Sequence, residues 1–212
     1  MIPFIRENLS ELLQKSGEHL YISLLALLFG TLVALPVGIL LTRLPRAAKP
    51  VIALVSLLQT IPSLALLAFM IPLFGVGKPP SIAALFIYSL LPILRNTYLG
   101  ITGVSSNLVD AAKGMGMTGA QRLFKVELPL AMPVIMAGIR LSAVYVVAWA
   151  TLASYIGAGG LGDYIFTGLN NYIPPMIIAG TIPITLMAIL LDLLLGLLEK
   201  ILTPGTGRRQ TA

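Results

Sequence analysis

The sequence contains no cysteine, and His19 is its only histidine. The absence of cysteine excludes disulfide bonds and thiolate metal ligands. A single histidine provides neither a paired metal ligand nor a base beside a nucleophile. Residues 75–78 read Gly-Val-Gly-Lys, but Pro79 follows them where a phosphate-binding loop needs serine or threonine. We therefore expect no catalytic residue, no bound metal and no cofactor in this chain.

Charged residues are scarce as well. They make up 10% of the 212 residues, whereas 57% are hydrophobic and the mean hydropathy is +0.95. Soluble domains carry about 25% charged residues, so this composition indicates a membrane protein. Several apolar runs reach the roughly 20 residues that cross a bilayer as a helix, which disfavours a β-barrel. The sequence predicts an all-α membrane protein, a helical bundle in the cell membrane.

The net charge of +6 comes from basic residues that lie between the apolar runs. This placement follows the positive-inside rule, so we expect contact with the lipid membrane and no nucleic-acid partner. Ten basic residues fall on one side and three on the other, which places the ten in the cytoplasm. The cytoplasmic group is Arg43, Arg46, Lys49, Arg95, Lys113, Arg122, Lys125, Lys200, Arg208 and Arg209, and the outer group is Arg6, Lys15 and Lys78.

Five apolar runs predict five transmembrane spans, with the N-terminus outside and the C-terminus in the cytoplasm. Pro62 and Pro72 interrupt the second run, so it is one broken span or two short helices, and six spans are the alternative. The runs cover residues 20–42, 51–74, 80–101, 131–156 and 176–198.

These runs define a transmembrane domain over residues 19–200, followed by a cytoplasmic tail over 201–212. The N-terminal segment 1–18 is more polar. Leucines recur at helical spacing within residues 5–18, which predicts an amphipathic helix on the membrane surface; the alternative is a frayed terminus.

A polar stretch with a specific spacing interrupts the second half of the chain. Asp110-Ala111-Ala112 is followed by three residues, Gly116, nine residues, and then an aliphatic residue, any residue, Leu128 and Pro129. With this spacing the chain resembles the permease subunits of bacterial ABC importers. The resemblance implies the fold of a type I ABC importer permease, and a cytoplasmic helix pair at residues 105–129 that docks in a cleft of an ATPase.

The residues of this segment also predict two short helices. Ser106 or Asn107 is suited to cap the first helix, Thr118 and Gln121 fit a capping box at the start of the second, and Pro129 is expected to stop it. Apolar side chains on such helices mark an interaction surface; the alternative is a loop packed on its own bundle. The expected docking residues are Asp110, Ala111, Ala112, Gly116, Met117, Leu123, Phe124, Leu128 and Pro129.

The resemblance also implies the partners. Two copies of an ABC ATPase subunit would bind ATP and magnesium, a second permease subunit, identical or homologous, would complete the pathway, and an extracellular substrate-binding protein would deliver the solute. An ion-coupled carrier would instead be expected to show inverted repeats and more buried acidic groups. An intramembrane enzyme would need a catalytic constellation, and the sequence shows none.

Three further stretches resemble the osmoprotectant branch of this family, which imports glycine betaine, carnitine and choline. They are residues 59–65, 91–98 and 150–164, within a resemblance over residues 19 to about 200. The third stretch also resembles methionine-type permeases, so an amino-acid importer is the alternative.

Aromatic residues suit such a substrate because a quaternary ammonium has no N–H to donate and binds aromatic faces by cation–π attraction. Tyr145 and Trp149 share one helix face, since they are four residues apart. We expect these two and Tyr155 to line the translocation pathway; the alternative is packing against lipid or a neighbouring helix.

Arg140 and Asp192 place charges within the fourth and fifth spans. An unpaired charge at the bilayer centre costs about 2.5 to 3.5 kcal/mol, and the two residues lie at overlapping depths. We expect them to pair, within one subunit or across a dimer. Alternatively, Arg140 extends to the headgroups and Asp192 faces water.

Overall fold

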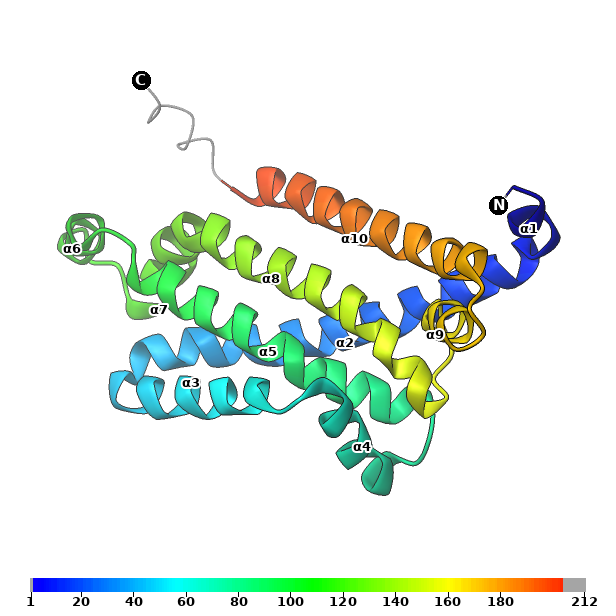
Figure 1. Ribbon diagram of the computed structural model, residues 1–212. Coiled ribbons are helices and arrows are strands. Elements are labelled where there is room, and N and C mark those ends of the chain that lie inside the picture. The colour runs from blue at the N-terminus through cyan, green and yellow to red at the C-terminus, as the bar shows by residue number, and fades with distance from the viewer. Residues whose placement is uncertain (1, 204–212) are drawn as a thin grey trace.

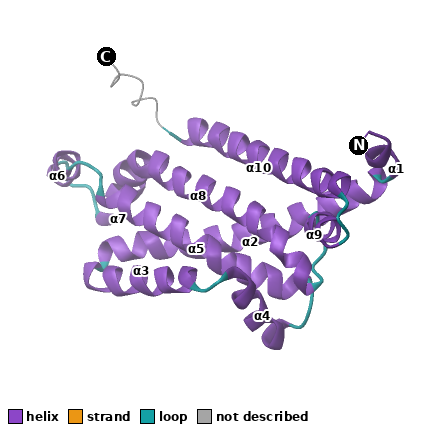
Figure 2. Ribbon diagram, viewed as in Figure 1, coloured by secondary structure: helices purple, strands orange, loops and turns teal. Residues whose placement is uncertain are grey.

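The computed structural model describes residues 2–203, in which helices are joined by loops and turns and no strand is present (Figures 1 and 2). Two short irregular helices are present, the π-helix η1 (Leu123–Glu127) and the 3-10 helix η2 (Thr151–Ile156). The α-helices are α1 (Ile2–Glu7), α2 (Leu9–Arg43), α3 (Pro45–Thr60), α4 (Ser63–Phe74), α5 (Lys78–Thr102), α6 (Ser106–Gly114), α7 (Gly119–Arg122), α8 (Leu128–Ala150), α9 (Gly162–Asn170) and α10 (Pro174–Leu202).

Four helical segments of the described chain are long and apolar enough to cross a membrane, and α3 with α4 makes a fifth if the pair is one span. The four segments are Leu9–Arg43, Lys78–Thr102, Gly119–Ile156 and Pro174–Leu202. These five units correspond to the five expected runs.

The second apolar run is interrupted, as expected, with an angle of 98° between α3 and α4. The break lies at Pro62, because the residue before a proline disfavours helical geometry and Ile61 is extended. Pro72 lies within α4 and does not break it. The Tyr88 hydroxyl donates to the Ile61 carbonyl at 2.6 Å, so a neighbouring helix satisfies a backbone group that the break has freed.

The N-terminal prediction was wrong. α2 begins at Leu9 and continues for 35 residues, so residues 9–18 extend the helix of the first span and form no separate surface helix. Only the six residues of α1 stand apart. The predicted tail at 201–212 starts in the last turn of α10, and its residues 204–212 lie outside the described part of the chain.

Polar residues in this first section of α2 contact the glycine-rich loop over residues 157–161, which joins η2 to α9. Glu18 accepts a hydrogen bond from the Gly160 backbone N–H at 3.1 Å and pairs with Lys78 at 3.1 Å. Lys15 pairs with Asp163 at the start of α9. Ion pairs and a hydrogen bond therefore hold this loop and the start of α9 against α2, and Glu18 also links α2 to α5.

Gly159 occupies a position in this loop that a larger residue cannot fill without strain. Its φ is +78°, and an added Cβ would lie 2.4 Å from Glu18 Oε2. We expect Gly159→Ala to lower the Tm of the purified protein in detergent by about 3–6 °C, because a positive φ and the displaced Glu18 together cost about 1–2 kcal/mol. The same change at Gly17, an exposed helical glycine with open space around it, should not lower the Tm. Equal shifts at both positions would contradict this account.

The centre of the bundle is formed by α2, α5 and α8, which pack closely along their lengths. Small residues permit the approach of α2 and α5, since a Cβ added at Gly38 would lie 2.8 Å from the Thr97 side chain. Close packing of this kind holds helices together in a bilayer, where burial of apolar surface gives no net drive. The core therefore fixes where the two ends of the bundle lie.

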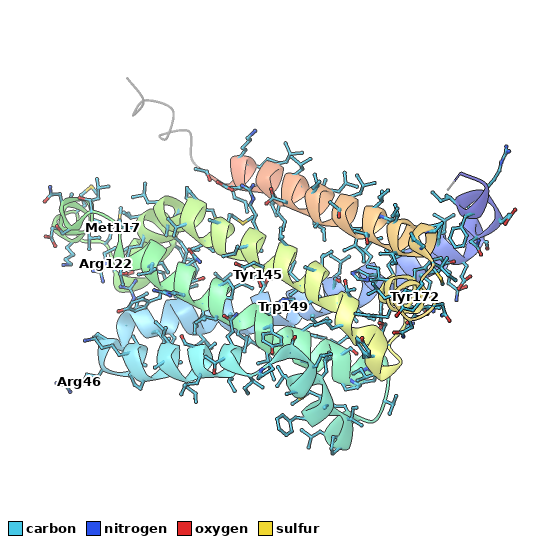
Figure 3. All side chains as sticks on the ribbon, viewed as in Figure 1. Arg46, Met117, Arg122, Tyr145, Trp149 and Tyr172 are labelled. Atoms are coloured by element: carbon cyan, nitrogen blue, oxygen red, sulfur yellow. The ribbon has the colours of Figure 1, made fainter. Side chains whose placement is uncertain are left out.

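The two ends of the bundle carry different elements (Figure 1). One end holds α6, α7 and the connection between α2 and α3, and Arg46 and Arg122 lie there (Figure 3). The opposite end holds α1 and α9. The predicted docking segment therefore shares one end with the basic α2–α3 connection.

Candidate functional site

The predicted docking segment projects from one end of the bundle as α6, α7 and η1 (Figure 1). α6 begins at Ser106, so Ser105 is the residue before the helix, and neither Ser106 nor Asn107 is its cap. Asp110 lies in the second turn of α6. Its Oδ1 lies 2.8 Å from the Lys113 Nζ, and both side chains are more than half exposed.

A glycine turn and a capping box join the two short helices. Gly116 has a φ of +74°, in the left-handed region that favours glycine. The Gln121 N–H donates to the Thr118 hydroxyl at 3.3 Å, and the Thr118 N–H donates to the Gln121 Oε1 at 2.9 Å. The structure thus contains the predicted capping box, with Thr118 as the N-cap of α7.

The expected stop at Pro129 was wrong. Helical structure continues from α7 through η1 into α8, and Pro129 lies in the first turn of α8. In η1 the Leu128 N–H donates to the Leu123 carbonyl, five residues back. A π-helix is a common local feature of functional sites, and here its wider turn precedes a proline that has no N–H to donate. The docking segment is therefore continuous with a transmembrane helix.

The predicted docking residues differ in accessibility. Ala112 is buried and takes no part in the exposed surface, because it lies on the inner side of α6. Phe124 is 68% exposed and Met115 is 69% exposed. Of the other predicted residues, Asp110, Ala111 and Gly116 are exposed, whereas Met117, Leu123, Leu128 and Pro129 are partly exposed.

Glu127 is a buried carboxylate that the sequence analysis missed. Arg122 Nε lies 2.9 Å from its Oε1, and Arg43 at the end of α2 pairs with its Oε2. The local signal was an acidic residue between the aliphatic Val126 and Leu128, immediately before a transmembrane helix. Nothing in that signal identifies Arg43 as its partner.

The structure brings the two intramembrane charges together within one chain. Arg140 Nε lies 2.8 Å from Asp192 Oδ1, and its Nη2 lies 2.9 Å from Asp192 Oδ2. The third nitrogen, Nη1, donates to Glu199 Oε2 at 2.9 Å. The sequence analysis missed Glu199, although it lies seven residues after Asp192 and thus on the same face of α10. One guanidinium in α8 is held by two carboxylates of α10.

The aromatic residues of α8 form a small stack. The Tyr145 and Trp149 rings have centroids 5.7 Å apart and are inclined by 19° (Figure 3). Tyr88 of α5, which the sequence analysis missed, meets Trp149 edge-on at 4.2 Å. Tyr155 is not part of this stack; it packs on Phe166 of α9, with centroids 4.2 Å apart. Tyr145 is 41% exposed, so one face of the stack is accessible.

The sequence profile of one protein family, described as "Binding-protein-dependent transport system inner membrane component", matches residues 26–208. The chain belongs to this family. It is a transmembrane permease component of an ATP-driven importer and lies in the cell membrane with several spans.

Several curated relatives are similar to this permease along nearly their whole length. It is 58% identical over 204 residues to the glycine betaine/carnitine/choline transport system permease protein OpuCB of Bacillus subtilis, covering 96% of this chain and 94% of that protein. It is 59% identical over 204 residues to the carnitine transport permease protein OpuCB of Listeria monocytogenes, with the same two coverages.

Solved structures show the same fold. An inward-facing form of the MetNI methionine ABC transporter matches the permease with a TM-score of 0.81 and 23% identity, over 91% of this chain and 96% of that chain. The structure of an amino acid ABC transporter with histidines matches with a TM-score of 0.76 and 21% identity, and the match covers 95% of this chain and 98% of that chain. The permease has the fold of type I ABC importer permeases, as predicted.

The ion network of α8 and α10 predicts an unequal response to loss of its charges. We expect Arg140→Gln to lower the Tm of the permease by about 5–10 °C, because it leaves Asp192 within the fifth span and Glu199 at its end without a counter-charge. Asp192→Asn should have a smaller effect, since Arg140 keeps Glu199. The charge-swapped variant Arg140→Asp with Asp192→Arg should recover part of the loss. A larger shift for Asp192→Asn than for Arg140→Gln in thermal unfolding would contradict the network.

Proposed function

We propose that this permease imports quaternary-amine compatible solutes, of which glycine betaine, carnitine and choline are examples. The observation that carries this proposal is the 58% identity along 94% of a relative whose name specifies those three solutes. A second relative, 56% identical over 209 residues, is the choline transport system permease protein OpuBB of Bacillus subtilis. The likeness to the methionine transporter, at 23% identity, concerns the fold alone.

The aromatic stack supports the same solutes. The cation–π interaction between a quaternary ammonium and an aromatic face contributes about 0.5 to 2 kcal/mol of binding free energy per contact. Tyr145 offers an accessible ring, and Trp149 is fixed behind it by Tyr88. In this proposal Tyr145 and Trp149 contact the solute as it crosses, and Tyr155 belongs to the packing of α9.

The coupling route follows from the continuity of one helical segment, Gly119–Ile156, which joins the docking segment to α8 without a loop. A displacement of α7 by an ATPase would therefore be passed along α8 to Tyr145 and Trp149. The ion network of Arg140 would extend this motion to α10. ATP and magnesium bind to the partner, and the permease itself performs no covalent chemistry.

The assembly we propose contains two permeases, identical or homologous, two ATPase subunits and an extracellular binding protein. The exposure of α10 supports the presence of a second permease. Only 6% of the 18-residue apolar stretch of this helix is buried within the chain, so much of its surface is available for a partner. The distribution of charge supports an outer N-terminus and a cytoplasmic C-terminus, since Arg46 and Arg122 share the end of the bundle that carries the docking segment (Figure 3).

Reconstitution tests this function. Proteoliposomes that contain the permease with its ATPase and binding protein should accumulate radiolabelled glycine betaine when ATP is enclosed, and carnitine or choline should compete. The permease alone should not accumulate it. Uphill uptake by the permease alone would indicate a carrier, and ATP-dependent uptake of methionine without any quaternary amine would indicate an amino-acid importer; either result would overturn the proposal.

A further inference from the structure

Glu127 occupies an unusual position at the base of the docking segment. It is the last residue of η1, its side chain is 4% exposed, and two arginines from different elements meet it. Arg122 ends α7 and approaches Oε1 at 2.9 Å, and Arg43 ends α2 and approaches both carboxylate oxygens. One buried carboxylate thus joins the docking segment to the end of the first span.

The contact is stable only while all three charged groups are present. A buried charge is stable only when it is paired, and removal of one partner leaves the others uncompensated. Here the loss of the carboxylate would leave two guanidinium groups close together with no anion between them. Arg43 is also separated from α3 by one residue, Leu44, so the same contact reaches the second span.

The outer part of the docking segment is less firmly supported. α6 makes its main contacts with α7 and η1, and not with the transmembrane helices. A cavity of about 260 Å³ lies between α6 and the bundle, with Thr42, Arg43, Asp110 and Glu127 in its wall. α6 therefore has space to shift, whereas Glu127 at the edge of this space is held by two charges.

We propose that Glu127 is a positioning residue that couples the docking segment to the first and second spans. When the ATPase displaces α6 and α7, the ion pairs of Glu127 move the end of α2 and the start of α3 together with α8. The spans on both sides of the contact then change position in one step. This inference rests on the proposed function, because it concerns how ATP hydrolysis on the partner drives uptake.

The test compares uptake with ATP hydrolysis in the same proteoliposomes, made with the complete complex. Glu127→Gln should retain the ATPase subunit during purification and continue to hydrolyse ATP, while glycine betaine taken up per ATP falls about tenfold, the scale expected for loss of one partner of a buried charge pair. Glu7→Gln, which removes an exposed carboxylate in α1, is the matched control and should leave the ratio unchanged.

Two further variants separate coupling from simple destabilisation. Glu127→Asp keeps a carboxylate between the two arginines, and it should retain at least part of the uptake per ATP. Arg43→Lys keeps the charge but loses the two-pronged contact, so it should lower the ratio in a complex that still assembles, even if Glu127→Gln fails to fold.

The inference is overturned if Glu127→Gln or Arg43→Lys assembles and transports with the wild-type ratio of solute to ATP. It is also overturned if uptake and hydrolysis fall in parallel in both variants, because that result would assign Glu127 a structural role alone. A wild-type complex that takes up no quaternary amine would instead contradict the proposed function, so the two failures are distinguishable.

Discussion

Replacement of Phe124 by alanine is expected to weaken binding of the ATPase subunit to the permease at least tenfold. Phe124 is 68% exposed on the docking segment, and an exposed aromatic on an element that projects from the bundle is suited to fill a pocket of a partner. Truncation of such an anchor removes on the order of 2 kcal/mol or more of binding free energy. The measurement is the dissociation constant of the detergent-solubilised permease for the purified ATPase.

The chain provides a matched control for this change. Phe69 in α4 has nearly the same exposure, 65%, but does not belong to the docking segment. Phe69→Ala should leave ATPase binding unchanged, and a second change in the docking segment, Met115→Ala, should weaken it further in combination with Phe124→Ala. Equal affinities for the Phe124→Ala and Phe69→Ala variants would show that the docking surface lies elsewhere.

Replacement of Trp149 by alanine is expected to reduce the rate of glycine betaine uptake about 2- to 30-fold in the reconstituted complex, which corresponds to the loss of one cation–π contact. Trp149 also supports the stacked Tyr145 ring, so Tyr145 should lose its orientation in the same variant. Tyr145→Ala should reduce uptake as well, whereas Tyr145→Phe, which retains a ring, should retain most of it.

Tyr21 in α2 is the control for these aromatic changes, because it is 54% exposed and lies outside the stack. Tyr21→Ala should not alter uptake. Unchanged uptake in the Trp149→Ala and Tyr145→Ala variants would contradict a pathway role for the stack. Solute selection would then depend on the binding protein.

Some features were predictable because their signals are local or compositional. The five apolar units follow from the length of the hydrophobic runs, since each run must cross the same thickness of hydrocarbon. The capping box at Thr118 was predictable because its two hydrogen bonds join residues three positions apart. The break at Pro62 follows from the restriction that a proline places on the residue before it.

Other predictions failed where a distant partner or a neighbouring turn changed the local preference. The leucine spacing in residues 5–18 predicted an interfacial helix, but α2 runs from Leu9 into the first span, and Lys15 and Glu18 have partners in α9 and α5. Pro129 appeared to end a helix, yet η1 and the first turn of α8 need no N–H from it. The sequence did not indicate that Tyr155 packs on Phe166 of α9 and lies apart from the Tyr145–Trp149 stack.

The sequence by itself determined that this chain is an all-α membrane protein and indicated its family, because hydrophobic length, charge placement and the spacing of a short motif are properties of the chain alone. The sequence predicted the Arg140–Asp192 pair and the shared face of Tyr145 and Trp149, but tertiary structure decided the other contacts between charges and between rings. Arg43 and Glu127 are 84 positions apart, and Arg140 meets Asp192 and Glu199 only because α8 and α10 present those faces to one another. Such contacts depend on the rotation of each helix about its axis, which is set by packing against several neighbours at once.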